Sequence, residues 1–188
     1  MKRRLALTIS CLLVAGVVPA DENIQARVEE GKGVIQAFFG DLKGELSKGM
    51  KERGPVGSID ICHKVAPHLA QAHSQMSGWQ VGRTSLKVRN PDNAPDAWET
   101  AVMKSFESRM AAGEDPKKLV KAEVVVEDGR QVFRMMKAIP TAEVCTKCHG
   151  VSIAEPVAAK LDELYPNDQA RGFKVGDLRG AFTLKKPL

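Results

Sequence analysis

The sequence predicts an α+β fold in which long helices lead into a small antiparallel sheet with further helices packed around it. Two observations predict this class. Apolar residues recur every three or four positions over residues 24–50, which is the period of an amphipathic helix. Residues 121–141 instead form a β-rich segment around Asp128-Gly129, a strong short-range signal of a β-hairpin.

The first twenty residues are predicted to be a secretory signal peptide. They combine a basic start, "MKRR", with an apolar run and a small residue, Ala20, before acidic residues. The run is too short for a permanent membrane span, and an uncleaved N-terminal anchor is the alternative. We therefore expect residues 1–20 to be removed and residues 21–188 to form one exported, soluble domain in the periplasm or an equivalent compartment, with no stable membrane span.

The net charge argues against nucleic-acid binding. The full chain has 28 Lys and Arg residues against 23 Asp and Glu residues, a net charge of +5. The signal peptide removes three basic residues and no acidic ones, so the net charge falls from +5 to +2. That balance leaves no basic footprint of the kind that nucleic acids require.

The first helix is expected to stop at "RGPVGS", residues 53–58, because Gly and Pro break helices. Ser58 is then expected to cap a second helix that carries Cys62 on its apolar side and is disturbed by Pro67. The remaining elements are expected in this order: a short strand or extended segment at 79–90, turns at 90–99, a helix at about 95–112, the hairpin at 121–141, a short helix near 155–164 and a last strand at about 177–184.

The motif "CTKCH", Cys145 to His149, has the spacing used for covalent attachment of c-type haem. Cys145 and Cys148 would add to the porphyrin, and His149 would become an axial ligand of the iron. A zinc site completed by Cys62 and a thioredoxin-like dithiol are the alternatives. Adjacent Cys and His seldom share one tetrahedral metal, a dithiol gives His149 no role, and export favours haem. We therefore predict one haem c, attached through Cys145 and Cys148.

The second axial ligand is the open question. Residues 150–188 contain no Met, His or Cys, so a ligand of these types must lie upstream, unlike in a small cytochrome c. A four-helix cytochrome is disfavoured because β-forming residues precede the motif. The upstream donors are Cys62, His63, His68, His73, Met103, Met110, Met135 and Met136.

Cys62 differs from these other donors because it is left unpaired once haem takes two of the three mature cysteines. A small buried thiol without a ligand role is the alternative. His63, about a hundred degrees further round an α-helix, is the second candidate. The methionines are more often core residues, and histidines such as His63 are by default surface or capping residues.

Four segments occur in a characteristic order: "IDICHKVAP" (59–67), "GRTSLKVRNPDNAPDAWE" (82–99), "CTKCHG" (145–150) and "YPNDQARGFKVGDLRGAFTL" (165–184). Together they resemble the family of c-type haem domains with a PAS-like fold that was described from cyanobacteria as a domain of unknown function. The resemblance implies a PAS-like haem domain over residues 21–188. It also implies iron ligation by His149 on one side and by a cysteine, matching Cys62, on the other.

Arg83 and Arg89, within "GRTSLKVRNP", are expected to contact the haem propionates, because a guanidinium forms bidentate, charge-assisted bonds with a carboxylate. Ordinary surface charge is the alternative for both arginines.

His/Cys ligation predicts a low potential, since a thiolate stabilises ferric iron. On reduction the thiolate bond weakens and a position opens for a small gas or another side chain, which suits a redox- or gas-responsive sensor module. Its partner would be a redox protein or a membrane signalling protein. A low-potential periplasmic electron-transfer cytochrome c is the alternative. No enzymatic activity is expected, because no acid/base pair is identifiable and a thiolate occupies the sixth position.

Overall fold

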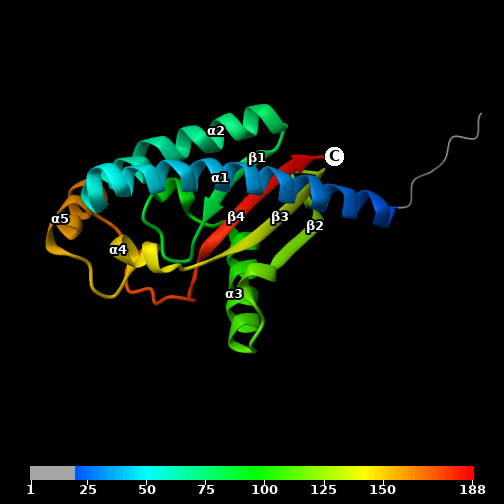
Figure 1. The fold of residues 1–188 in the computed structure, drawn as a ribbon. Coiled ribbons are helices and arrows are strands. Elements are labelled where there is room, and N and C mark those ends of the chain that lie inside the picture. The colour runs from blue at the N-terminus through cyan, green and yellow to red at the C-terminus, as the bar shows by residue number, and fades with distance from the viewer. Residues whose placement is uncertain (1–19) are drawn as a thin grey trace, which may run out of the picture.

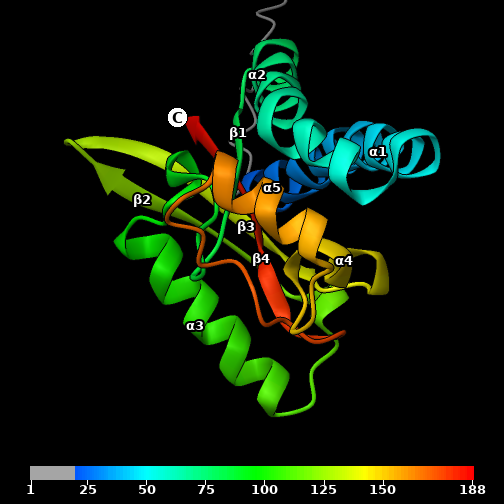
Figure 2. The ribbon, with the colours of Figure 1, turned by 90° about the vertical axis from the view of Figure 1, so that its left-hand side faces the viewer.

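A four-stranded antiparallel sheet separates two helical layers in the computed structural model, which describes residues 20–188 (Figures 1 and 2). Helices α1 (Ala20–Asp60) and α2 (Ala66–Ser77) cover one face, and α3 (Ala97–Ala111) covers the other. The predicted α+β class with a long N-terminal helix is thereby confirmed. The predicted signal peptide lies outside the described residues except for Ala20.

The strands are β1 (Gln80–Thr84), β2 (Val120–Glu127), β3 (Arg130–Pro140) and β4 (Leu178–Pro187), in the spatial order β1-β4-β3-β2. β2 and β3 form the predicted hairpin, and its turn residues Asp128 and Gly129 both have positive φ, 51° and 74°. A tight turn of this kind matches the twist of the two strands. β4 pairs with both β1 and β3, so the last strand of the chain is central in the sheet.

The first helix is longer than its apolar period predicted, because the segment 53–58 kinks it without ending it. Only Gly54 leaves helical geometry, with φ 66° and ψ −173°, and Pro55 follows at a position where its missing N–H costs little. Ser58 does not cap a new helix, since its hydroxyl donates to the Gly54 carbonyl oxygen at 2.7 Å. α1 therefore continues to Asp60.

Two apolar clusters hold the helices against the sheet. α1 and α2 bury Phe38 and Ala66 against Phe133 of β3 and other apolar residues of the sheet, and α3 buries Met103 and Phe106 against the opposite face. Because side chains alternate along a strand, neighbours on β3 serve different clusters: Met135 faces α1, and Met136 belongs to the α3 cluster. Met103, Met135 and Met136 are fully buried, as their expected core role requires.

A third apolar cluster lies at the end of the molecule where α1 finishes. It packs Ile59 of α1 against Val157 and Leu161 of α5 (Glu155–Leu164) and against Tyr165, and Cys148 of α4 (Thr146–His149) contacts it. The cysteine motif is therefore anchored on the same cluster as the end of α1. No helix within residues 20–188 has the length and apolar character that a membrane span needs.

Candidate functional site

Cys62 and His63 lie on a π-helical turn, η1 (Ile61–Val65), between α1 and α2. The Ala66 N–H donates to the Ile61 carbonyl, five residues back, as a π turn requires. Pro67 at the start of α2 has no N–H to offer the His63 carbonyl, which favours this wider turn over α-helix. Successive side chains on a wider turn diverge by less than the 100° of an α-helix, and Cys62 and His63 are both half-buried.

The cysteine motif follows β3 and is held by the loop that precedes β4. Cys145 ends a short 3-10 turn, η4 (Glu143–Cys145), and Cys148 and His149 lie on α4. The Phe173 N–H donates to the His149 carbonyl at 2.9 Å, and the Gly172 N–H donates to the Gly150 carbonyl at 3.0 Å. Residues from two parts of the chain thus fix the backbone of the motif.

The His149 ring is oriented in the manner of a metal ligand. Its Nδ1 lies 2.8 Å from the Ala170 carbonyl oxygen, so Nδ1 carries the proton and donates, and Nε2 keeps its lone pair. Burial, followed by the positive charges of Arg179 and Arg89, lowers the pKa of His149 well below its usual value. The ring is therefore neutral, which is the form that binds a metal.

Cys62 lies close to the motif although the two are distant in sequence, because Cys148 packs in one cluster with Ile59, three residues before Cys62, and with Tyr165, which His63 contacts at 3.2 Å. Burial, followed by the negative charge of Cys62, raises the pKa of Cys148. The same two causes raise the pKa of Tyr165 to about 12. The three cysteines that the structure describes, Cys62, Cys145 and Cys148, are all free thiols.

The zinc alternative has no assembled ligand set. Within residues 20–188, no three His, Cys, Asp or Glu side chains lie close enough together to hold a metal ion. Cys62 therefore does not complete a tetrahedral set with Cys145, Cys148 and His149, which is the geometry a structural zinc site requires.

Arg89 is committed to the protein itself. Its guanidinium forms two hydrogen bonds to the Asp168 carboxylate, at 3.0 and 2.9 Å, and also donates to the carbonyls of Cys148 at 2.7 Å and Ala170 at 3.2 Å. The side chains of Arg89 and Asp168 are only 8% and 2% exposed. Because Ala170 also accepts the proton of His149, Arg89 joins the motif to the loop that orients its histidine.

Two other arginines, Arg83 and Arg179, have no carboxylate partner in the described part of the chain. Among residues 23–188, no carboxylate lies within ion-pairing distance of Arg83 or Arg179. The Arg83 guanidinium lies 5.9 Å from the Phe38 ring centroid, and Arg179 donates to the Ser85 hydroxyl at 3.1 Å. Burial lowers the pKa of Arg83, which the negative charge of Cys62 partly offsets. Burial, followed by the charges of Arg89 and Arg83, lowers the pKa of Arg179 to about 10.

Arg179 was missed by sequence reasoning. Its Nη2 lies 3.5 Å from Nε2 of His149, at the limit of a hydrogen bond, so this contact is weak and easily exchanged. The residue lies inside the segment 165–184 that carries the family resemblance, but nothing in its local pattern distinguishes it from a surface arginine.

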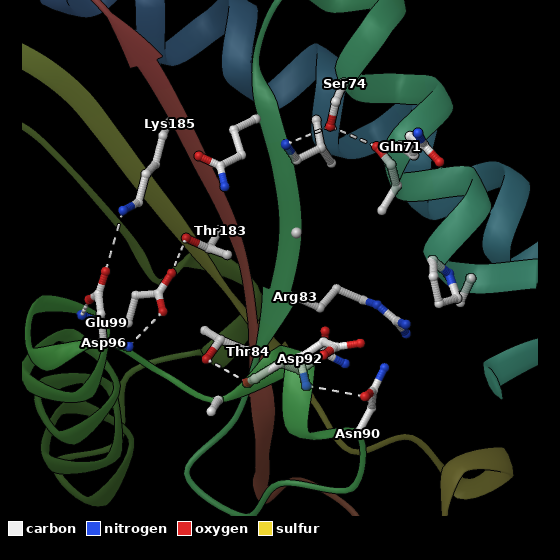
Figure 3. Close-up of a pocket in the computed structure, with 18 residues that line it drawn as sticks. Gln71, Ser74, Arg83, Thr84, Asn90, Asp92, Asp96, Glu99, Thr183 and Lys185 are labelled. Atoms are coloured by element: carbon white, nitrogen blue, oxygen red, sulfur yellow. Dashed lines mark hydrogen bonds and ion pairs between the residues drawn. The ribbon is translucent and has the colours of Figure 1, made fainter. Parts of the chain in front are cut away.

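Arg83 also borders a polar cavity of about 460 Å³ that runs along the edge strand β1 between α2 and α3. Figure 3 shows its guanidinium pointing from β1 toward α2, with Glu99, Thr183 and Lys185 across the strand. The polar groups on that far side form hydrogen bonds and ion pairs with one another: Thr183 donates to Glu99 at 2.6 Å, and Lys185 pairs with Asp96 at 3.5 Å. None of the cysteines described, nor His149, lines this cavity.

Fold and site together define an α+β domain, helices on both faces of its sheet, with a cysteine–histidine centre at one end. A sequence profile of the Tll0287-like family matches residues 17–187, and the chain belongs to this family. The structure is similar to the crystal structure of the cyanobacterial haem protein Tll0287, with a TM-score of 0.63 and 24% sequence identity over 90% of this chain and 97% of that chain. No curated protein matches the chain. The family resemblance inferred from four sequence segments is therefore confirmed.

Proposed function

We propose that this chain is an exported haem-c-binding protein that acts as a redox- or gas-responsive sensor module, with His149 and Cys62 as axial ligands. One observation carries the proposal: a single apolar cluster packs Cys148 of the motif with Ile59, so η1 and its Cys62 follow directly after a residue that lies at the motif. Membership of a family whose cyanobacterial representative is a haem protein supports it.

The donor set fits a c-type haem. Cys145 and Cys148 are free thiols at the spacing that thioether attachment uses. His149 is neutral, and its Nε2 is available because Nδ1 is engaged by Ala170. Val157 and Leu161 of the third cluster supply apolar surface beside Cys148.

The charges fit as well. Haem carries two propionate carboxylates, and Arg83 and Arg179 are two half-buried guanidinium groups without a carboxylate among residues 23–188. A buried charge without a partner is costly, so both arginines favour anionic groups nearby. We therefore assign the propionates to Arg83 and Arg179. We assign Arg89, first considered for the same role, to holding the motif and its loop together.

When bound, haem supplies an iron that changes between the ferric and ferrous states. Cys62, as an anionic donor, favours the ferric state and gives a low potential. Cys62, as an anion, would hold reduced iron less strongly than oxidised iron, and its release would leave a position for CO, NO or another side chain. Because Cys62 lies in η1, at the junction of α1 and α2, its release would alter the turn that joins the two helices. A membrane signalling protein or a redox partner would detect that change, and no enzymatic step is required.

Optical and EPR spectra of the wild type and Cys62→Ala, oxidised and reduced, test this proposal. We expect a ferric low-spin thiolate signature in the wild type and its loss in Cys62→Ala. His68→Ala, an exposed position on α2, is the matched control and keeps the signature. A thiolate signature that survives Cys62→Ala refutes the axial assignment. CO binding after reduction supports the sensor. A haem that stays six-coordinate and excludes CO supports the electron-transfer alternative.

A further inference from the structure

The His63 ring is held in place by Tyr165. Nδ1 of His63 lies 3.2 Å from the Tyr165 hydroxyl oxygen, and the two rings meet edge to face with their centroids 5.2 Å apart. Tyr165 is buried and packs in the third apolar cluster with Leu161. His63 is therefore a fixed, half-buried side chain and not the surface or capping residue that is the default for a histidine on a helix.

The contact with Tyr165 leaves the second ring nitrogen free. When Nδ1 carries the proton it donates to the Tyr165 hydroxyl oxygen, and Nε2 keeps its lone pair. No residue from 23 to 188 hydrogen-bonds Nε2 of His63. The Nδ1 of His149 is engaged in a related way by the Ala170 carbonyl, which can only accept, whereas the Tyr165 hydroxyl can accept or donate. A hydrogen bond from the other ring nitrogen is how proteins orient a histidine for a metal.

The π turn places Cys62 next to the histidine that Tyr165 holds. His63 contacts the Tyr165 hydroxyl directly, and Cys62 precedes it on the same turn. The two donors are adjacent on a turn where successive side chains diverge less than on an α-helix. An exchange between them therefore needs only local rearrangement of η1.

We infer that His63 replaces Cys62 on the haem iron when the iron is reduced, and that Tyr165 is the positioning residue for this exchange. The inference rests on the proposed haem site and names the side chain that fills the vacated position. One electron from an external reductant converts ferric to ferrous iron. The Cys62 Sγ leaves with both electrons of its bond and takes one proton from solvent, and the Nε2 lone pair of His63 forms the new bond. A neutral donor replaces an anionic one as the iron loses a positive charge, which is the electrostatically favoured direction.

The test compares His63→Ala and Tyr165→Phe with the wild type and with His68→Ala, using dithionite as the reductant. In the ferric state all four proteins are expected to keep the thiolate signature. In the ferrous state the wild type and His68→Ala are expected to be six-coordinate and low-spin, and His63→Ala to be five-coordinate and high-spin. The apparent CO affinity of reduced His63→Ala should rise about tenfold or more, because an internal ligand present in roughly nine-tenths of the molecules lowers it by that factor.

Tyr165→Phe keeps the ring that packs against His63 and removes only the hydroxyl. It should raise the apparent CO affinity by about threefold to tenfold, the factor that one neutral hydrogen bond supplies. A structural role for the pair would leave the ferrous spectrum unchanged. Ferrous spectra and CO affinities of both variants equal to those of the wild type overturn the inference, even if Cys62→Ala has confirmed the thiolate. Survival of the thiolate signature in Cys62→Ala instead defeats the proposed function itself. If His63→Ala does not fold, Tyr165→Phe alone decides.

Discussion

Arg89→Met is expected to destabilise the protein by about 3 kcal/mol. Removing one partner of a buried ion pair costs about 3–5 kcal/mol, because the other charge stays buried without compensation. Arg89 and Asp168 are 8% and 2% exposed, so they belong to this class. Asp168 keeps a second partner in Arg171, at 2.8 Å, which places the cost at the lower end. The variant also leaves the carbonyls of Cys148 and Ala170 without their donor.

Urea and thermal unfolding, followed by far-UV circular dichroism, measure this loss. For a chain of this length, about 3 kcal/mol corresponds to a fall in Tm of roughly 6–12 °C. Arg109→Met is the matched control, because its pair with Glu114 is 38% and 47% exposed and solvent screens such pairs, so they contribute little to stability. If Arg89→Met loses no more stability than Arg109→Met, the argument that Arg89 ties the motif to its loop is wrong.

Two further predictions concern charge. Arg83→Leu and Arg179→Leu should each lower the reduction potential by about 20–60 mV, because a positive charge near the iron disfavours its ferric state. A spectroelectrochemical titration measures this change, and a rise in potential contradicts the assignment of the haem propionates to these two arginines. Arg130→Leu, exposed at the hairpin, is the control. Burial raises the pKa of Asp168, but hydrogen bonds from its two arginine partners outweigh it and lower that pKa overall. The stabilisation by the Asp168 carboxylate is therefore complete above about pH 4 and is lost as the pH falls through the lowered pKa. In Asp168→Asn, the slope of the unfolding free energy against pH between about pH 5 and 2 should decrease by the equivalent of roughly one proton. An unchanged slope contradicts this prediction.

Local patterns predicted the elements whose cause is local. The hairpin depends on two adjacent residues that accept positive φ, Asp128 and Gly129, and the structure has the turn at those residues. The third helix was predicted to follow the turn residues at 90–99, and in the structure Asp96 forms a complete capping box with Glu99 at its start. In each case the interacting residues lie only a few positions apart, so the sequence alone shows which residues will contact each other.

The same reasoning failed where the outcome depends on packing. Ser58 has the side chain of a helix cap, but the helix resumes at Pro55 and buries Ser58 inside α1. Arg89 and Arg179 look alike in sequence as basic residues in loops or strand ends. Only the structure shows that Asp168 neutralises Arg89 and that no described carboxylate neutralises Arg179.

The sequence by itself determined the chemistry that lies within a few consecutive residues. Cys145, Cys148 and His149 are spaced by the covalent chain, so the attachment chemistry proposed for them rests on the motif alone. Only the tertiary structure decided what surrounds these residues: Ile59, close to Cys62 in the chain, packs in one cluster with Cys148, the Ala170 carbonyl contacts the His149 ring, and Tyr165 contacts His63. These contacts join residues far apart in the chain. They exist because apolar clusters pack α1, α5 and the last strand together. An apolar residue in the sequence predicts that its side chain is buried, but it does not predict which residue it packs against.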